Sequence, residues 1–199
     1  MAPRIVLIAH AATAATRRGA FPFDEAIERS GDMDPVEIRS VQLLSGPESR
    51  CIQTAAALGW TPTVIPGLAD LDAGRWTGRD LGDLFDTEPG ALQRWMTDAD
   101  ANPPGGESLT DLVRRVGAVL DGLEWPDGRS ILVTTPMVIR AAITHLLRAP
   151  NDLLFSIDIE PLSATVLTGH AGRWKLRGLL PMGSWGIRSG VDRSVLDGQ

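Results

Sequence analysis

The polar residues at the ends of three short apolar runs are the ones that could do chemistry. They are His10 after the first run, Arg50 shortly after the second and Thr135 after the third. An imidazole is a nucleophile or a general base near neutral pH, and a guanidinium binds phosphate oxygens through paired hydrogen bonds. Helices that begin near these positions add free backbone N–H groups, which attract an anion. The three positions together predict a phosphate site.

The elements that must position these residues follow from the apolar pattern. Short apolar runs rich in β-branched residues predict strands buried on both faces, and apolar residues at helical spacing predict helices between them. Such alternation predicts an α/β fold with a mostly parallel central sheet and helices on both faces, in which ligands bind at the carboxyl ends of the strands. The predicted strands are Arg4–Ala9, Val41–Leu44, Ile131–Thr134 and, more weakly, Thr61–Ile65; the predicted helices are Glu48–Leu58, Glu107–Leu123 and Pro136–Leu147.

The chain is predicted to form one domain over residues 1–181, followed by a flexible tail at 182–199. The segment 73–104 is rich in Gly, Asp, Trp and Pro and is predicted to be an insertion that covers the site. Near the end, Ser163–Thr168 and Arg173–Leu179 flank a Gly-containing turn, which predicts an antiparallel hairpin at the edge of the sheet. An exposed edge of this kind can pair with a second copy, so a dimer is one expectation.

Composition narrows the class of partner. The chain has 199 residues and a formal net charge of -6, which disfavours nucleic acid and anionic membranes as partners. No run reaches about 18 apolar residues, so we expect a soluble, cytoplasmic protein. The single cysteine, Cys51, excludes an internal disulfide and a cysteine-based zinc site, and the scattered histidines predict neither a metal nor a cofactor.

Five sequence blocks resemble, in order, the motifs of the histidine phosphatase (phosphoglycerate mutase-like) superfamily. The first is similar to the signature Arg-His-Gly-x-Thr, the second carries a serine, an arginine and Gln-Thr-Ala, and the third carries an acidic residue before Gly-x-Trp-x-Gly. The fourth resembles a Gly-Glu-Ser helix start, and the fifth resembles an apolar strand followed by Ser-His-Gly-Gly and Val-Ile-Arg. The blocks are Ile5–Thr13, Ser45–Ala55, Leu68–Gly78, Pro104–Ser108 and Ile131–Ala141.

The resemblance implies a reaction and the residues that carry it. His10 is then the nucleophile that forms a phosphohistidine, and either Asp70 or Glu107 is the proton donor to the leaving group. The substrate is a small phosphorylated or anionic molecule. Implied substrate-binding residues are Arg50, Thr13, Arg17, Arg18 and Thr135.

Departures from the family pattern leave the activity open. The first arginine of the signature is Ala9, and the family's second histidine is Thr135. Each lost donor costs on the order of 10²–10³ in rate. Arg17 and Arg18, on a predicted loop after His10, or Arg140 further along, are candidates to restore the charge. The sequence therefore predicts a phosphatase-like hydrolase of weak or altered activity; the alternatives are a non-catalytic pseudoenzyme that binds a phosphorylated or acidic ligand, and a repurposed enzyme.

Several of these residues also have structural interpretations. Thr135 followed by Pro136 is typical of a helix N-cap with proline at the first helical position. Glu107 suits a helix N-terminus, where a carboxylate is stabilised by the helix dipole. Asp70 suits a turn-rich acidic loop, and Arg50 an exposed helix position. The cap at Thr135 does not exclude ligand contact, because it lies at the end of the helix that attracts anions.

Overall fold

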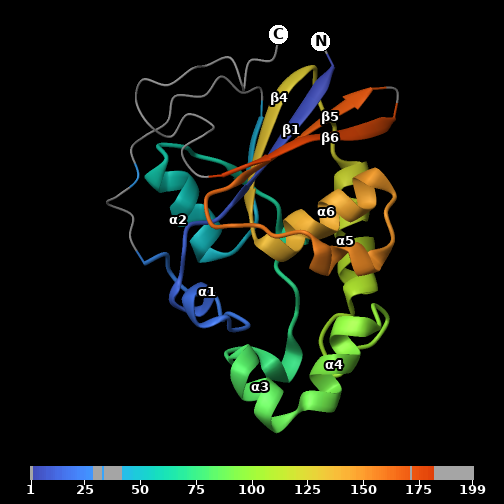
Figure 1. The fold of residues 1–199 in the computed structure, drawn as a ribbon. Helices are drawn as coiled ribbons and strands as arrows, with labels where there is room; N and C mark the ends of the chain where they lie inside the picture. Colours follow the sequence, from blue (N-terminus) through green and yellow to red (C-terminus); the bar gives the residue numbers. More distant parts are fainter. Residues whose placement is uncertain (1, 29–32, 34–41, 171, 182–199) are drawn as a thin grey trace.

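The computed structural model describes residues 2–28, 33, 42–170 and 172–181, and the predicted tail at 182–199 lies outside them. Six strands form one sheet in the order β3-β2-β4-β1-β5-β6 (Figure 1). The four strands from β3 to β1 run parallel, whereas β5 is antiparallel to both β1 and β6. This sheet confirms the predicted fold class and the hairpin at its edge. The strands are β1 Pro3–Ala9, β2 Gln42–Ser45, β3 Thr63–Val64, β4 Gly128–Thr134, β5 Ala164–His170 and β6 Arg173–Leu180.

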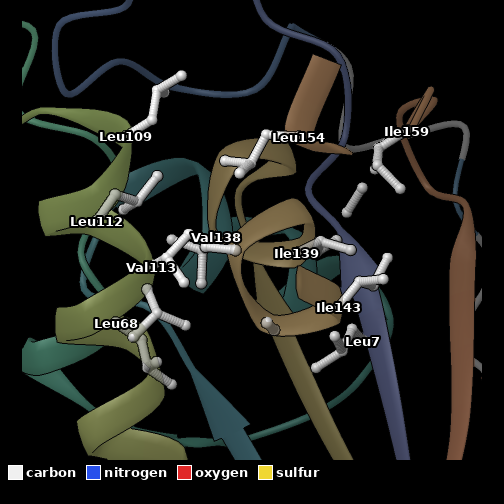
Figure 2. Packing of buried hydrophobic residues seen from close by; sticks show 14 of the residues in the cluster. Leu7, Leu68, Leu109, Leu112, Val113, Val138, Ile139, Ile143, Leu154 and Ile159 are labelled. Atoms are coloured by element: carbon white, nitrogen blue, oxygen red, sulfur yellow. The ribbon is translucent and has the colours of Figure 1, made fainter. Parts of the chain in front are cut away.

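Helices cover both faces of the sheet, as the sequence predicts. Helix α2 (Ser49–Ala57) lies on one face, and α5 (Leu109–Gly122) and α6 (Pro136–Leu147) lie on the other (Figure 1). Successive side chains of a strand point to opposite faces, so β1 contributes to both cores. Leu7 packs in the cluster with α5 and α6 (Figure 2), whereas Ile8 packs in the cluster with α2. No helix in the described part of the chain is long and apolar enough to cross a membrane.

Helix starts are fixed by short-range hydrogen bonds. The Ser108 hydroxyl accepts from the Asp111 backbone N–H and Asp111 bonds back to Ser108, so α5 begins at Leu109 rather than at Glu107. The predicted N-cap at Thr135 is confirmed, because its hydroxyl accepts from the Val138 N–H at 3.4 Å and Pro136 follows it. A cap of this kind stabilises a helix by about 1 kcal/mol.

The prediction that Arg17 and Arg18 lie on a loop is wrong. They end a short helix, α1 (Ala14–Arg18), because Thr13 and Thr16 form a capping box at its start and Gly19 ends it in the left-handed conformation with φ 64°. Left-handed backbone carries no steric penalty at glycine, which explains where the helix stops.

The segment 73–104 carries two helices, α3 (Leu81–Thr87) and α4 (Pro89–Thr97), that project from the body of the sheet (Figure 1). Its two ends are hydrogen-bonded to each other. The Glu107 N–H donates to the Asp72 carbonyl at 2.8 Å, and the Arg75 N–H donates to the Pro104 carbonyl at 3.1 Å. The chain therefore leaves and re-enters the domain at one place. Short 3-10 turns at Pro66–Leu68, Gly74–Trp76 and Asn151–Ser156 complete the described elements.

Candidate active site

The three predicted strand ends lie side by side. Strands β2, β4 and β1 are neighbours in the sheet, and all three run in the same direction. The His10 N–H donates to the Thr134 carbonyl at 3.0 Å, and the Gly46 N–H donates to the Val133 carbonyl at 2.9 Å. The sheet itself thus places His10, the turn before α2, and Thr135 at one edge, which is where parallel sheets bind ligands.

His10 is buried, with 4% of its surface exposed. Its Nδ1 lies 2.7 Å from the Ala11 carbonyl oxygen, and because that oxygen can only accept, Nδ1 carries the proton and Nε2 the lone pair. Burial lowers the pKa of His10, and the positive charge of Arg50 lowers it further, against the raising effects of the Ala11 hydrogen bond and of the Asp70 and Glu25 charges. The imidazole is therefore neutral near pH 7, with its lone pair on a defined nitrogen.

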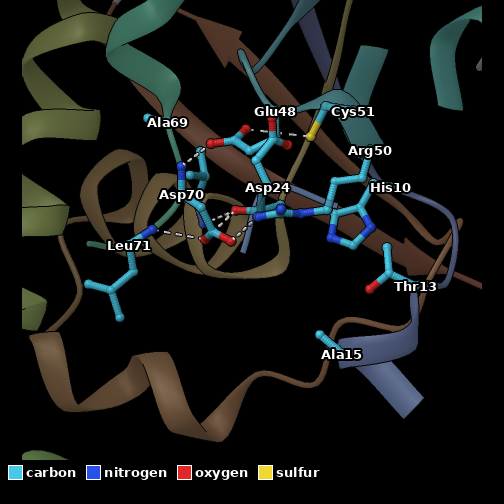
Figure 3. A network of polar contacts seen from close by, with 12 residues as sticks. His10, Thr13, Ala15, Asp24, Glu48, Arg50, Cys51, Ala69, Asp70 and Leu71 are labelled. Atoms are coloured by element: carbon cyan, nitrogen blue, oxygen red, sulfur yellow. Dashed lines mark hydrogen bonds and ion pairs between the residues drawn. The ribbon is translucent and has the colours of Figure 1, made fainter. Parts of the chain in front are cut away.

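Arg50 is buried, not exposed, with 2% of its side chain accessible. Its Nη2 donates to Asp70 Oδ2 at 2.6 Å (Figure 3), and its Nη1 donates to the Phe23 carbonyl at 3.1 Å. Its Nε is buried and has no hydrogen-bond partner among the described residues. A buried guanidinium with a spare donor beside the histidine is what an anion site requires.

Asp70 receives hydrogen bonds on both carboxylate oxygens. Oδ2 accepts from Arg50, and Oδ1 accepts from the Thr135 hydroxyl at 2.8 Å and from the Leu71 N–H at 2.9 Å. Two of the residues that the sequence assigns to substrate binding, Arg50 and Thr135, therefore hold the carboxylate of Asp70, which the sequence assigns as a candidate proton donor. The structure brings these three residues together through direct contacts.

A second carboxylate, Glu48, lies beside Asp70 and was not among the residues predicted from the sequence. Its Oε1 accepts the Asp70 backbone N–H at 2.5 Å, and its Oε2 lies 3.7 Å from the Cys51 Sγ (Figure 3). Burial raises the pKa of Glu48, and the nearby charge of Asp70 raises it further. The sequence offers one weak signal for it: an acidic residue between a buried strand and Arg50.

The carboxylate of Glu107 is paired with Arg115, whereas a proton donor would need to face the leaving group of a substrate. Arg115 binds both of its carboxylate oxygens, at 2.6 and 2.7 Å, and also donates to the backbone carbonyls of Gly67, Ala69 and Asp70. Hydrogen bonding to Glu107 raises the pKa of Arg115. This arginine, which sequence reasoning missed, fastens the Asp70 loop to helix α5. The ion pair with Arg115 therefore gives Glu107 a structural role.

The remaining predicted residues are engaged in other contacts. Thr13 is buried and caps α1. Arg17 forms an ion pair with Glu28, and Arg18 with Asp80 at 3.3 Å. Arg140, the third candidate for restoring charge, donates through Nε to the Ile157 carbonyl at 2.8 Å. None of these contacts is made with His10 or Asp70, so a cation that would replace the lost arginine stays a prediction.

The Gln-Thr-Ala part of the second motif has a physical explanation. The Thr54 hydroxyl accepts from the Ala11 N–H at 2.9 Å and donates to the Arg50 carbonyl at 2.6 Å, which joins the loop after His10 to helix α2. Gln53 Oε1 accepts the Ile27 N–H at 3.0 Å, and Ala55 is fully buried against the sheet. The motif therefore holds the loop after His10 and Arg50 in one fixed arrangement.

Among the described residues, no group of three or more His, Cys, Asp or Glu side chains is arranged to hold a metal ion. The Cys51 thiol is fully buried, and burial raises its pKa well above its ordinary value. A thiol in this state is not a nucleophile near neutral pH, so Cys51 is a packing residue.

Known proteins similar to this chain include a bifunctional protein and a probable phosphoglycerate mutase. It is 28% identical over 138 residues to a bifunctional protein of Mycobacterium tuberculosis and spans only 37% of that protein's length. It is also 28% identical over 162 residues to a probable phosphoglycerate mutase of Yersinia pestis, which covers 78% of the chain and 73% of the mutase.

Solved structures with the same fold include two mycobacterial proteins. A glucosyl-3-phosphoglycerate phosphatase in complex with VO3 is 26% identical, with a TM-score of 0.75, over 88% of this chain and 97% of that one. A protein described as mycobacterial hydrolase 1 is 25% identical, with a TM-score of 0.77, over 91% and 99%. The model of the histidine phosphatase superfamily (branch 1) matches residues 23–180. The chain therefore belongs to the histidine phosphatase superfamily.

Proposed function

We propose that the chain is a phosphatase-like hydrolase that acts on a small phosphate ester through a phosphohistidine at Nε2 of His10. One observation carries the proposal: a buried, neutral His10 whose Nδ1 is committed to the Ala11 carbonyl, which leaves the lone pair on Nε2. A nucleophilic histidine needs this tautomer and this protonation state. The relationship to phosphatases of phosphate esters supports the same reaction class.

Substrate binding requires an exchange of anions. In the structure Arg50 and Thr135 hold the Asp70 carboxylate. A phosphate group offers the guanidinium more oxygen acceptors than a carboxylate does, and a second negative charge. The phosphate takes the donors of Arg50, including the free Nε, and the hydroxyl of Thr135, and Asp70 moves aside by a side-chain rotation.

The exchange prepares Asp70 to donate a proton. A carboxylate that has lost its guanidinium and lies beside a dianion favours its protonated form. Nε2 of His10 then attacks phosphorus, so that the P–N bond forms and the bond to the leaving oxygen breaks, while Asp70 gives that oxygen its proton. Water attacks the phosphohistidine in the second step, the P–N bond breaks, and Asp70 takes the proton of the water. Glu107 is less suited to this role, because Arg115 occupies both of its oxygens.

Turnover is expected to be slow. The positions of Ala9 and Thr135 supply no positive charge to the phosphoryl oxygens, and each such donor contributes on the order of 10²–10³ in rate. A second candidate function, a non-catalytic protein that binds a phosphorylated or acidic ligand, is favoured by a different observation. The ionic contact between Arg50 and Asp70 completes the site without a ligand, which suits recognition better than repeated turnover.

A panel of phosphate esters tests the proposal, with released phosphate as the readout. Wild type is expected to release phosphate from at least one ester, and His10→Ala to release none. His145→Ala is the matched control, because His145 pairs with Asp121 on helix α5, away from the three strand ends. Wild type quenched during turnover is expected to carry an acid-labile, base-stable phosphate. Equal rates in wild type and His10→Ala would refute the phosphohistidine mechanism, and specific binding without turnover would favour the second candidate.

A further inference from the structure

Glu48 contacts the backbone of Asp70 from the side of the site where helix α2 begins. It stands at the position just before that helix, yet its side chain makes no capping bond there. Instead Oε1 accepts the Asp70 N–H at 2.5 Å and Oε2 lies 3.7 Å from the thiol of Cys51. A Cβ at Gly46 would lie 2.9 Å from Oε2, so the glycine leaves room for this carboxylate. The side chain is thus turned inward onto the Asp70 loop.

The charges around Glu48 couple it to Asp70. The positive charge of Arg50 lowers the pKa of Glu48, and Arg115 also interacts electrostatically with Glu48. The Cys51 thiol is neutral. The negative charge of Asp70 helps to raise the pKa of Glu48. The two residues are joined through the Asp70 N–H, and Arg50 pairs directly with the Asp70 carboxylate.

We infer that Glu48 is a positioning residue for the acid step: it holds the backbone of Asp70 and places beside it the negative charge that makes Asp70 take up a proton when an anion occupies Arg50. The inference rests on the proposed function. It assigns two separable contributions to one side chain. The hydrogen bond from the Asp70 N–H fixes the position of the acid, and the charge of Glu48 controls its protonation.

The charge contribution can be isolated, because glutamine keeps the acceptor oxygen that Asp70 requires. In Glu48→Gln the amide oxygen still accepts the Asp70 N–H, but the negative charge is gone. Glu124→Gln is the matched control. It removes the same charge beside Gln42, at the opposite end of β2 from the site. A difference in activity between the two variants therefore reports where the charge was removed, because the net charge of the protein changes equally in both.

The first experiment compares two leaving groups. An alkyl phosphate needs a proton on its leaving oxygen, whereas p-nitrophenyl phosphate leaves as a stable phenolate and depends little on an acid. Glu48→Gln is expected to lower kcat on the alkyl ester by about tenfold or more and on the aryl ester by less than about threefold. The alkaline limb of its kcat profile is expected to move down by about one pH unit. A purely structural role would lower both substrates equally and leave the limb in place.

The second experiment does not depend on turnover. Sulfate stays dianionic near neutral pH, so any proton taken up when it binds comes to the protein. Calorimetric titration with sulfate in buffers of different ionisation enthalpy counts these protons, and a His10→Gln background keeps the imidazole from contributing. About one proton per sulfate is expected with Glu48 present, and less than half of one with Glu48→Gln. In the same background, Asp70→Asn is expected to abolish the uptake.

The two experiments separate the possible failures. Wild type that releases no phosphate, but takes up a proton with sulfate only when Glu48 is present, would refute the proposed function and with it the acid step, while the effect of Glu48 on proton uptake at the site would stand. Phosphatase activity with the same leaving-group dependence and the same proton uptake in wild type and Glu48→Gln would overturn the inference alone. Protein that does not bind sulfate, or binds it without proton uptake, would also overturn it.

Discussion

Removing the Asp70 side chain should convert a closed ionic contact into an open anion site. In Asp70→Ala the guanidinium of Arg50, with only 2% of its side chain exposed, loses its carboxylate, and the Thr135 hydroxyl loses its acceptor. Breaking a buried ion pair costs about 3–5 kcal/mol. Because 18% of the Asp70 side chain is exposed, water replaces part of the loss, and we expect about 2–3 kcal/mol.

The expected loss is large enough to measure by thermal unfolding. For a domain of this size each kcal/mol lowers Tm by about 2–4 °C, so Asp70→Ala is expected to unfold about 4–12 °C below wild type. Phosphate or sulfate then fills the vacated position between Arg50 and Thr135. At a concentration 100 times its Kd, an anion stabilises the folded state by about 2.7 kcal/mol, which restores most of the loss.

Asp80→Ala is the control for this experiment. Asp80 pairs with Arg18 at 3.3 Å, and both side chains are about half exposed, so the pair contributes little to stability. We expect little change in its Tm and no added response to phosphate. If Asp70→Ala were as stable as wild type, or gained no more from phosphate than wild type does, the view that Asp70 occupies an anion site would be wrong.

Three further predictions follow from other parts of the site. Because burial lowers the pKa of His10 below 6.5, the unfolded chain binds more protons, so Tm is expected to fall as pH drops below about 6.5, and His10→Gln should flatten this dependence in a pH series of melts. Ala9→Arg combined with Thr135→His is expected to raise phosphate release by at least about 10²-fold if the pocket still supports phosphoryl transfer, and a folded double variant with no gain would argue for a different reaction. Gly106→Ala would place a Cβ 2.0 Å from the Asp72 carbonyl, so it is expected to lower the free energy of unfolding by about 1–3 kcal/mol in urea titrations, and an unchanged midpoint would show that the loop yields freely.

Strand and helix positions could be predicted because they depend on local patterns. The run at Arg4–Ala9 is apolar enough to be buried on both faces, and it forms a central strand. Thr135 and Pro136 carry the chemistry of a helix start, and they start a helix. The prediction of a loop at Arg17 and Arg18 is wrong because Thr13 and Thr16 form a capping box. This box stabilises the start of α1 enough to offset the short length of the helix.

The contacts inside the site could not be predicted, because they join distant parts of the chain. Asp70 meets Arg50 across 20 residues and Thr135 across 65, and no local pattern states which oxygen faces which donor. Glu48 escaped notice for the same reason, since its partner is a backbone N–H and not a side chain. An arginine with acceptors in four different residues, such as Arg115, is visible only once the loop and the helix are packed together.

The closed base of the 73–104 segment has a consequence for how this protein can diversify. Because Asp72 bonds to Glu107, and Arg75 to Pro104, the two ends of the segment stay together whatever lies between them. The entropy cost of a longer loop grows only slowly with its length, so changes at the exposed positions of α3 and α4 cost the body little. Leu84, Leu92 and Trp95 are different, because they are buried in the core cluster that the segment shares with α5 and α6. Arg115 holds the Asp70 loop from helix α5, outside the exchanged part. The segment can therefore be exchanged while the loop that holds Asp70 keeps its place, provided these three core residues are kept, and grafting the corresponding segment of a relative between Ala73 and Pro104 directly tests what the segment contributes.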